Sequence, residues 1–387
     1  MKIAFLNHND PLNVRSWSGT LFYMFHALAR HCGEVVPLGP AGQKAYTASK
    51  IARRALSAFG FRIDPEHTTL LARAWARTFQ QKLKHAGCEV IYAPVASTEI
   101  AFLETDLPIV YYSDITAELF LNYSESLMGL SAWSLKQTRE VEGRALQRAD
   151  KAVFSSQWAA DSAIRLYALP EGKVSVVLMG ANLESAPARD DILAARNRTR
   201  SGEWRLLFIA VDWERKGGDI ALEAMRVLRA RGINAHLTVV GCEPPPGACG
   251  PHVRVIPLLD KRVPEQRRQL EQLMLDSDFM IFPTRRDASP IVCAEANAFG
   301  LPLIAADLGG LAIQNGDNGI LLRPGASGAE YADVIQKLMD APARYLELAL
   351  AGRRAYESRL NWDAWAKSMA GIFHNALHGN PAGPRPL

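Results

Sequence analysis

Two carboxylates flank a predicted helix start in the second half of the chain. Residues 282–296 read Phe-Pro-Thr-Arg-Arg-Asp-Ala-Ser-Pro-Ile-Val-Cys-Ala-Glu-Ala, which is typical of a strand end, a tight loop and a helix, and place Asp287 and Glu295 eight positions apart. The unpaired N–H groups of a helix N-terminus attract an anion. Amides between two acids suit a ligand with phosphate at its centre and hydroxyls at its ends. A nucleotide sugar has this layout.

The same residues have structural alternatives. Asp287 or Ser289 would be an ordinary cap for the following helix. Glu295 lies in an otherwise apolar helix, where an unpaired carboxylate is costly, so it needs a partner. The two hydroxyls of a ribose would serve, and a salt bridge to Arg285 or Arg286 is the competing explanation.

A second charged cluster follows the predicted strand 205–209. Residues 212–218 read Asp-Trp-Glu-Arg-Lys-Gly-Gly, with Arg215 and Lys216 at the carboxyl end of that strand. An arginine that binds two oxygens and a mobile lysine charge, followed by glycines, can clamp a diphosphate. A solvated surface turn is the alternative.

A glycine loop opens the chain's first strand-and-helix unit. Gly19, flanked by Ser18 and Thr20, heads an apolar helical run over 21–29. Glycine there permits close backbone approach to a ligand's phosphate or sugar; a turn with a helix cap is the alternative. The loop has no G-x-G-x-x-G, which argues against a dinucleotide cofactor.

Two further strand ends carry candidate contacts. Asp114 follows the predicted strand 109–112 and would contact the donor sugar or the acceptor, or else cap the next helix. The loop from Ile256 to Lys261 follows another predicted strand and is expected to take part in choosing the base of a nucleotide.

A basic and aromatic stretch spans residues 50–84. It suits contact with anionic lipid or a charged glycan, but amphipathic helices that are merely solvated on one side have this pattern more often. Its cations outnumber Asp64 and Glu66, and aromatic residues are interleaved: Lys50, Arg53, Arg54, Phe59, Phe61, Arg62, Arg73, Trp75, Arg77, Phe79, Lys82 and Lys84.

Composition sets the protein's class. A length of 387 residues favours two domains, and 48% hydrophobic with 22% charged residues is typical of a globular protein. The net charge of +4 fits an anionic small ligand and does not require nucleic acid, for which no motif is present. With no signal peptide or membrane span evident, we expect a cytoplasmic protein, peripheral at most to the inner membrane face.

The cysteines do not indicate a disulfide or metal framework. There are five, an odd number, and they are widely scattered. Cys242, Cys249 and His252 lie close in sequence but lack the paired spacing of zinc ligands. We interpret their clustering as chance and expect no metal site.

Alternating strand and helix patterns predict an α/β protein with two Rossmann-like domains. We expect an N-terminal domain over 1–185 and a C-terminal domain over 203–361, joined by a polar linker, with a last helix near 362–378 that crosses back to the first domain. The tail 379–386 is predicted to be disordered. Strands are expected at 2–6, 90–93, 109–112, 152–154, 174–177, 205–209, 236–240, 253–256, 279–282 and 303–305.

Taken together, the segments 140–158, 173–182, 271–283 and 294–305 resemble retaining glycosyltransferase family 4, the glycosyl transferases group 1. The resemblance extends over nearly the whole chain and is most specific in the last segment. It implies the GT-B architecture, in which two Rossmann-like domains with parallel sheets face each other across a central cleft.

The resemblance also implies residue roles. Glu295 would hold the ribose, and Asp287 would contact the donor sugar at a place where the family usually has glutamate. The amides of Ile291 and Val292 would meet the diphosphate, and Lys216 would neutralise the leaving group. The full predicted set has Asp114, Arg215, Lys216 and Asp287 as catalytic residues and Ser18, Gly19, Thr20, Ile256, Ser289, Ile291, Val292 and Glu295 as donor-binding residues.

Three positions depart from the family pattern. Val211 stands where the family often has arginine, Pro290 where it has a glycine, and Ser113 where a histidine is common. Arg215 is placed to compensate for the first. Pro290 removes one N–H donor from the helix start.

The implied activity is metal-independent transfer of a sugar, as by a retaining hexosyltransferase, from a nucleoside diphosphate sugar to a hydroxyl of a glycan, lipid-linked or small-molecule acceptor. No cofactor is expected. The departing phosphate would take the acceptor's proton, so no protein nucleophile is required. Alternatives are an idle GT-B domain that binds a nucleotide sugar or scaffolds a partner, and an epimerase or phosphorylase on the same fold.

Overall fold

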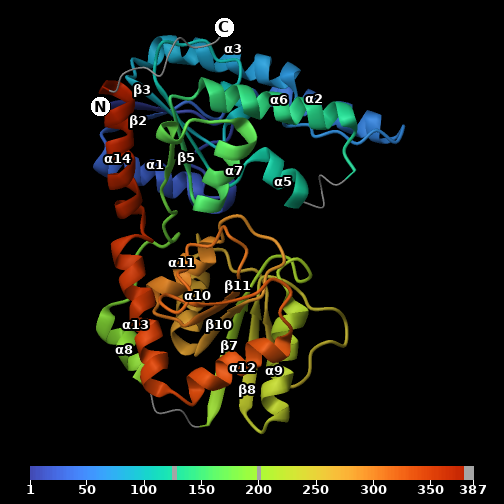
Figure 1. Ribbon diagram of the computed structural model, residues 1–387, viewed down its shortest axis with the longest axis vertical. Helices are drawn as coiled ribbons and strands as arrows, with labels where there is room; N and C mark the ends of the chain where they lie inside the picture. Colours follow the sequence, from blue (N-terminus) through green and yellow to red (C-terminus); the bar gives the residue numbers. More distant parts are fainter. Residues whose placement is uncertain (124–128, 198–201, 379–387) are drawn as a thin grey trace. The chain divides into compact units, whose positions relative to one another are not determined.

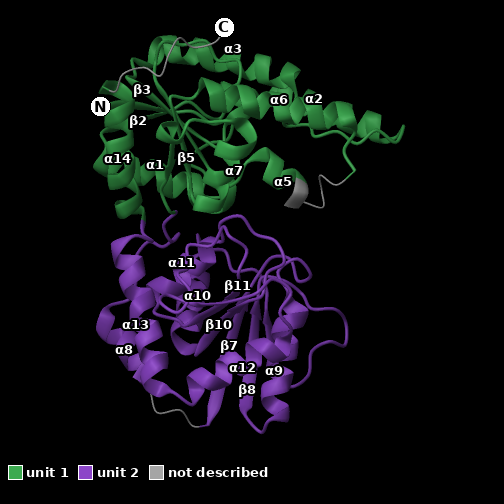
Figure 2. Ribbon diagram, viewed as in Figure 1, with its two compact units in different colours: residues 1–178, 362–387 green, residues 179–361 purple. Residues whose placement is uncertain are grey.

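The computed structural model describes residues 1–123, 129–197 and 202–378; the predicted disordered tail lies outside them. The chain forms two compact units (Figure 2). Unit 1 comprises residues 1–178 with 362–387, and unit 2 comprises residues 179–361. The last helix thus belongs to unit 1.

Unit 1 is built on a six-stranded parallel sheet in the order β2-β1-β3-β4-β5-β6. Its strands are β1 (Lys2–Phe5), β2 (Glu34–Pro37), β3 (Val90–Pro94), β4 (Ile109–Ser113), β5 (Lys151–Phe154) and β6 (Val174–Val176). Its helices are α1 (Thr20–His31), α2 (Gln43–Ser57), α3 (Thr69–Ala86), α4 (Ser97–Ile100), α5 (Ala117–Tyr123), α6 (Ala132–Arg148), α7 (Gln157–Tyr167) and α14 (Trp362–His378).

Both faces of this sheet are covered because side chains alternate along each strand. Tyr111 packs with α3, α6 and α7 in one core cluster. Tyr92 and Tyr112 point to the other face, where both meet Trp365 of α14 edge-on at 5.9 and 5.8 Å. The C-terminal helix therefore completes the core of unit 1.

Unit 2 repeats the plan with the strand order β12-β11-β10-β7-β8-β9, again all parallel. Its strands are β7 (Glu203–Ile209), β8 (Asn234–Val240), β9 (Val253–Ile256), β10 (Phe279–Phe282), β11 (Leu303–Ala306) and β12 (Ile320–Leu322). Its helices are α8 (Arg189–Asn197), α9 (Gly218–Ala230), α10 (Pro264–Asp276), α11 (Ile291–Ala298), α12 (Gly328–Met339) and α13 (Pro342–Ser358). The predicted α/β class with two Rossmann-like parallel sheets is confirmed.

The interpretation of residues 186–202 as a linker is wrong for the part that the structure describes. The segment contains α8, and Arg196 on that helix is buried. Its guanidinium donates to the carbonyl oxygens of Ser277, Met274 and Phe299, so the helix is fastened to unit 2. The segment's polar composition gave no sign that one of its arginines donates hydrogen bonds inside the fold.

Each sheet reverses its strand order at one point. In unit 1, β2 lies on one side of β1 and β3 on the other. In unit 2, β8 lies on one side of β7 and β10 on the other (Figure 1). Doubly wound folds bind ligands outside the carboxyl ends of the strands at such a switch point. The residues after β1 and β3, and after β7 and β10, are therefore the places to look for a site.

Candidate functional site

The switch point of unit 2 holds a lysine–carboxylate pair. Lys216 follows β7, Asp287 follows β10, and the Lys216 Nζ forms an ion pair with Asp287 Oδ2. Both side chains are mostly buried, at 12% and 16% exposure, and the Nζ lies 5.0 Å from the centroid of the Phe282 ring. Two residues that the sequence analysis took from separate motifs are thus in direct contact.

The loops that carry this pair are bound to each other. The Arg285 N–H donates to the Arg215 carbonyl oxygen at 2.9 Å, and the Arg285 guanidinium pairs with Asp219 at the start of α9. Gly217 has a φ of 76°, and a Cβ there would lie 2.2 Å from the Pro283 carbonyl oxygen. The glycine after Lys216 is therefore required by the approach of the two loops, and not only by a ligand.

Arg215 lies beside the pair but is held differently. Its Nε is 3.3 Å from Asp212 Oδ2, and its Nη1 donates to the Arg286 carbonyl oxygen at 3.0 Å. The side chain is 37% exposed, so its charge is partly screened by solvent. Arg215 positions the loop after β10 and leaves Lys216 as the more buried cation.

Glu295 is buried in α11 and paired with Lys261, a partner that the sequence analysis did not name. The Lys261 Nζ forms an ion pair with Glu295 Oε1, and the exposed fractions are 5% for Glu295 and 36% for Lys261. A structural salt bridge was one of the two explanations for this carboxylate, but with Arg285 or Arg286 as the cation. Lys261 is the last residue of the 256–261 loop, which the sequence analysis expected to take part in choosing the nucleotide base. That expectation was the signal in the sequence that pointed toward Lys261.

All three charged groups act on one buried thiol. Burial raises the pKa of Cys293 most, the Asp287 and Glu295 carboxylates raise it further, and Lys216 opposes them. Cys293 lies in the first turn of α11, so Lys216, Asp287 and Glu295 surround the start of that helix. The N-cap residue is Pro290, which makes no side-chain cap, and Ser289, Ile291 and Val292 are half-buried beside it.

Ile256 contributes to the core of unit 2. It ends β9 with 5% exposure and packs in the cluster that contains Leu207 and Val240. Its backbone carbonyl oxygen accepts from the Gly241 N–H at 3.0 Å. Only the loop that follows it reaches the edge where Lys261 meets Glu295.

In unit 1 the predicted glycine loop precedes α1. Trp17, Ser18 and Gly19 have φ values of 47°, 55° and 90°, three consecutive residues in the left-handed region, and Thr20 begins the helix. Left-handed backbone at non-glycine residues is strained. Gly19 is the N-cap of α1 but has no side chain that could cap the helix. The alternative of a turn with a helix cap therefore describes this loop only in part.

Asp114 lies directly after β4, at the carboxyl edge of the sheet of unit 1, as predicted. The alternative that it caps the next helix is not needed, because the Leu119 N–H donates to Thr116 Oγ1 at 3.4 Å, the pattern of an N-cap. Burial is the largest cause of the raised pKa of Tyr111, and the Asp114 carboxylate raises this pKa further.

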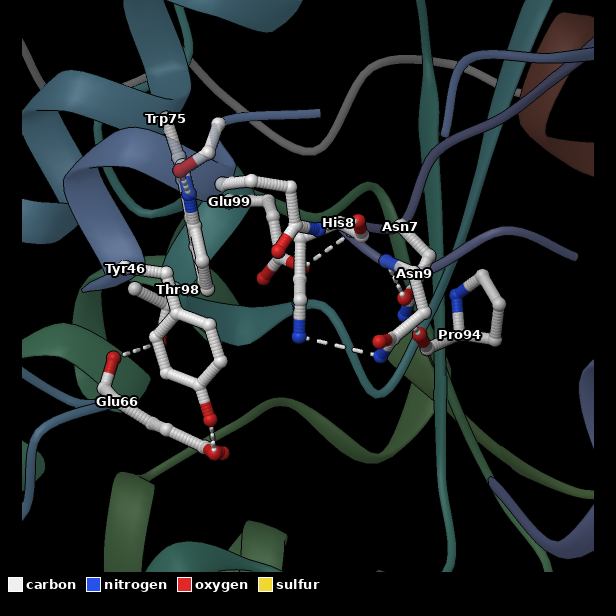
Figure 3. Close-up of polar contacts among 11 residues, drawn as sticks. Asn7, His8, Asn9, Tyr46, Glu66, Trp75, Pro94, Thr98 and Glu99 are labelled. Carbon is white, nitrogen blue, oxygen red and sulfur yellow. Dashed lines mark hydrogen bonds and ion pairs between the residues drawn. The ribbon is translucent and has the colours of Figure 1, made fainter. Parts of the chain in front are cut away.

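The switch point of unit 1 holds a histidine–carboxylate pair that the sequence analysis missed (Figure 3). His8 follows β1 and Glu99 follows β3; the His8 Nδ1 lies 2.6 Å from Glu99 Oε1, and the His8 backbone N–H donates to the same oxygen at 3.0 Å. The imidazole stacks on Trp75 at 4.4 Å, and its Nε2 lies 3.1 Å from the Asn9 side-chain nitrogen. The two residues are 91 positions apart, so no local motif joins them.

The basic stretch 50–84 divides into a core part and an exposed part. Trp75 and Phe79 are 1% and 0% exposed and belong to the core of unit 1, as expected for an amphipathic helix that is solvated on one side. Residues 51–62 are exposed throughout, with Phe59 at 80% and Phe61 at 57%.

Residues 203–341 match the family described as Glycosyl transferases group 1. That segment includes Lys216, Lys261, Asp287 and Glu295. Unit 2 carries a group 1 glycosyltransferase domain. The family resemblance seen in the sequence is thereby confirmed, and the charged pairs of unit 2 lie within the group 1 domain.

Curated relatives match part of the chain. It is 27% identical over 261 residues to the D-inositol 3-phosphate glycosyltransferase of Rhodococcus erythropolis, covering 63% of this chain and 58% of the relative. The corresponding enzyme of Jonesia denitrificans is 30% identical over 232 residues, covering 54% and 53%. The match thus spans little more than half the length of these relatives.

Solved structures share the fold over nearly the full length. Sucrose-phosphate synthase from Thermosynechococcus elongatus has a TM-score of 0.68 and 17% identity, covering 98% of this chain and 100% of that one. HepE from Anabaena in complex with UDP and glucose has a TM-score of 0.63 and 17% identity, covering 97% and 99%. WaaG, a glycosyltransferase involved in lipopolysaccharide biosynthesis, has a TM-score of 0.62 and 16% identity, covering 98% and 100%. These likenesses establish the two-domain glycosyltransferase fold.

The described residues also bear on two other classes of protein, those that span a membrane and those that hold a metal. Within 1–123, 129–197 and 202–378, every helix is too short or too polar to span a bilayer. The same residues contain no group of three or more His, Cys, Asp or Glu side chains placed to hold a metal ion, and Cys242 and Cys249 are free thiols.

Proposed function

We propose that the protein transfers a sugar from a nucleoside diphosphate sugar to an acceptor hydroxyl, with retention of the anomeric configuration and without a metal. The observation that carries this proposal is the pair Lys216–Asp287 at the switch point of a group 1 domain, with a second pair formed between Glu295 of α11 and Lys261 of the loop after β9. HepE, which shares the fold, has been crystallised with UDP-glucose, which supports a sugar nucleotide as the donor.

The charges of unit 2 suit the chemistry of a departing diphosphate. Its negative charge grows as the glycosidic bond breaks, and a preorganised cation at that place lowers the barrier. A diphosphate would take Lys216 from Asp287, leaving the carboxylate to a sugar hydroxyl. The half-buried N-terminal amides of Ile291 and Val292 would add donors.

Glu295 and Lys261 suit the nucleoside end. Glu295 is almost fully buried, and Lys261 at 36% exposure is the mobile member of the pair. Displacement of Lys261 by the ribose hydroxyls would keep the carboxylate satisfied. The acceptor hydroxyl would attack from the face that the leaving group vacates, and its proton would pass to the departing phosphate oxygen.

Measurement of released nucleotide tests this activity. The full chain is incubated with UDP-, GDP-, ADP- and dTDP-sugars, each with and without glycan, lipid-linked and small-molecule acceptors, including an inositol phosphate because the curated relatives carry that name. Acceptor-dependent release of one nucleoside diphosphate supports the proposal. Nucleotide binding without release under any acceptor would favour an idle binding domain, and release that requires inorganic phosphate would favour a phosphorylase.

We also propose that residues 50–62 contact an anionic membrane peripherally. The segment includes the end of α2, where Ile51 and Leu56 are 62% and 37% exposed, and continues as a loop in which Phe59 and Phe61 are 80% and 57% exposed. Lys50, Arg53, Arg54 and Arg62 lie among them, and exposed cations with large apolar side chains match an anionic lipid surface.

Vesicle sedimentation tests the membrane contact. The chain is expected to bind vesicles of phosphatidylcholine with phosphatidylglycerol and not phosphatidylcholine alone, and the double variant Phe59→Ser, Phe61→Ser should bind roughly 10-fold less because two apolar side chains no longer insert. Leu166→Ser, at an equally apolar position that is 47% exposed on α7, is the control. Unchanged binding of the double variant would refute the contact.

A further inference from the structure

A second ion pair of unit 2, Arg285–Asp219, holds the loop that carries Lys216. The Arg285 guanidinium donates to both carboxylate oxygens of Asp219, at 2.9 and 2.6 Å. Its Nη1 also donates to the Glu214 carbonyl oxygen, and the Arg285 backbone N–H donates to the Arg215 carbonyl oxygen at 2.9 Å. Glu214 and Arg215 precede the lysine in the chain, and Asp219 follows it. One arginine therefore binds the loop on both sides of Lys216.

The pair has a specific geometry although it lies near the surface. The side chains of Arg285 and Asp219 are 39% and 58% exposed, and ion pairs with this exposure contribute little to stability. A guanidinium that binds both oxygens of one carboxylate nevertheless fixes the direction of the contact as well as its length. Arg285 lowers the pKa of Asp219 most, and backbone N–H groups at the start of α9 lower it further, so the carboxylate is held in its charged form. The pair thus orients one loop on the other.

The loop after β10 holds Lys216 at two places. Asp287 binds the Nζ of the lysine, whereas Arg285, two residues earlier, binds the backbone beside it. In the proposed reaction the diphosphate takes the Nζ from Asp287. The partners of Arg285 are backbone oxygens and Asp219, which do not change when the Nζ exchanges one anion for another. Arg285 can therefore keep the lysine in place after Asp287 has released it.

We propose that Arg285 and Asp219 are positioning residues that place Lys216, through the backbone of its loop, for the departing diphosphate of the sugar donor. The inference rests on the proposed sugar transfer for the leaving group, but the place of the lysine can be observed without turnover. A shift of about 1 Å in a catalytic group can cost on the order of 100-fold in rate. Because other contacts also hold this loop, we expect a smaller loss, of about 10-fold, when the pair is broken.

Steady-state kinetics of nucleotide release test the positioning role. Asp219→Asn keeps the shape of the side chain and removes its charge, and it should lower kcat about 10-fold while the KM for the donor changes by less than about 3-fold. This split is expected because a misplaced cation matters most when the charge of the leaving group grows. Arg285→Lys keeps one positive charge and should retain more activity than Arg285→Ala. A rise in KM with unchanged kcat would overturn the proposal.

The ion pair Arg231–Asp333 supplies a matched control at the opposite end of α9. Its side chains are 34% and 53% exposed, and its Nη2–Oδ1 distance is 2.6 Å. Asp333→Asn should lower the melting temperature about as much as Asp219→Asn and leave kcat unchanged. Added to Lys216→Ala, Asp219→Asn should cause no further loss of kcat, because it acts through the lysine. Equal loss of kcat in the two single variants, or a further 10-fold loss in the double variant, would contradict the assigned role.

Nuclear magnetic resonance of lysines methylated with ¹³C observes the place of Lys216 without a donor. The Nζ lies 5.0 Å from the centroid of the Phe282 ring, so the ring current should set its signal, assigned with Lys216→Arg, apart from those of exposed lysines. Asp219→Asn should move this signal toward theirs, and Asp333→Asn should not. An unmoved signal in Asp219→Asn would overturn the positioning. If the signal moved but the wild-type chain released no nucleotide, the proposed function would fail and the positioning of the lysine by the pair would be supported.

Discussion

The two switch points differ in the cation that faces the carboxylate. Unit 2 uses lysine twice, in Lys216–Asp287 and Lys261–Glu295, whereas unit 1 uses histidine in His8–Glu99. Lysine carries a full charge throughout the physiological range and suits a diphosphate. Burial opposes the charge of His8, but Glu99 outweighs burial and raises the pKa of His8, so the charge of this pair changes with pH. One topology repeated in a single chain thus provides two edges of different chemistry.

The largest expected effect is that of removing the phosphate-facing charge of unit 2. Lys216→Ala should lower transfer by about 100-fold or more, the scale of losing one preorganised electrostatic donor. The measurement is kcat for release of nucleoside diphosphate under saturating acceptor. Arg215→Ala, which removes a neighbouring and more exposed cation, is the matched control and should have a smaller effect.

Near-normal turnover in Lys216→Ala would break the comparison. A loss of turnover that is accompanied by a matching fall in the melting temperature would also contradict the assigned role, because the lysine would then only stabilise the loop around Asp287.

A smaller effect is expected from neutralising the buried acid on α11. Glu295→Gln keeps the shape of the side chain and should raise the KM for the donor by about 10-fold, since a charge-assisted hydrogen bond contributes roughly 1.5–3 kcal/mol. Lys261→Ala is the companion variant, because it removes the ion pair and leaves the carboxylate. If Glu295 only balances Lys261, both variants will lower the melting temperature and leave the KM unchanged.

His67 should make the stability of unit 1 depend on pH. Burial opposes the charge of His67, but Asp64 outweighs it and raises the pKa of His67 to about 9. A raised histidine pKa contributes stability that is complete below pH 6.5 and is lost as the pH rises toward 9. Glu142, whose pKa is raised by burial to about 7, titrates mostly below this window. Lys173, whose pKa is lowered by burial to about 8, titrates inside it and adds stability as the pH rises, so the contribution of His67 is read from a comparison with a variant that lacks it.

Urea unfolding at pH 7, 8 and 9 measures this contribution. Relative to His67→Gln, the free energy of unfolding of the wild-type chain should fall on the order of 1–2 kcal/mol across that range, as the partly exposed pair loses its charge. In His67→Gln the decline should be smaller. An equal decline in both proteins would show that the pair does not set the pH response.

The pattern of the sequence was sufficient to predict the two sheets and the charged residues at the carboxyl edge of the sheet of unit 2. Alternating apolar runs predicted ten of the strands, and the acids and lysine of unit 2 stand out because each lies in a local motif with a glycine or a helix start. The strands β2 and β12 were missed because they are short, partly exposed edge strands without a buried run.

Contacts between distant residues were not predictable in the same way. His8 and Glu99 are joined only by the order of β1 and β3 in the sheet, and Lys261 reaches Glu295 across 34 positions. Arg196 was assigned to the linker because a buried arginine that donates to backbone carbonyl oxygens has no sequence signature. Single-sequence patterns report local periodicity, and these pairs depend on tertiary packing.

Thermal unfolding of the full chain with UDP-, GDP-, ADP- and dTDP-sugars tests the central claim most directly, because a ligand of the folded state raises the melting temperature. We predict that one nucleotide raises it for the wild-type chain and that the increment is lost in Lys216→Ala, Glu295→Gln. If no nucleotide changed the melting temperature, or if the doubly substituted chain kept the full increment, the assignment of a sugar-nucleotide site to Lys216, Asp287 and Glu295 would be contradicted.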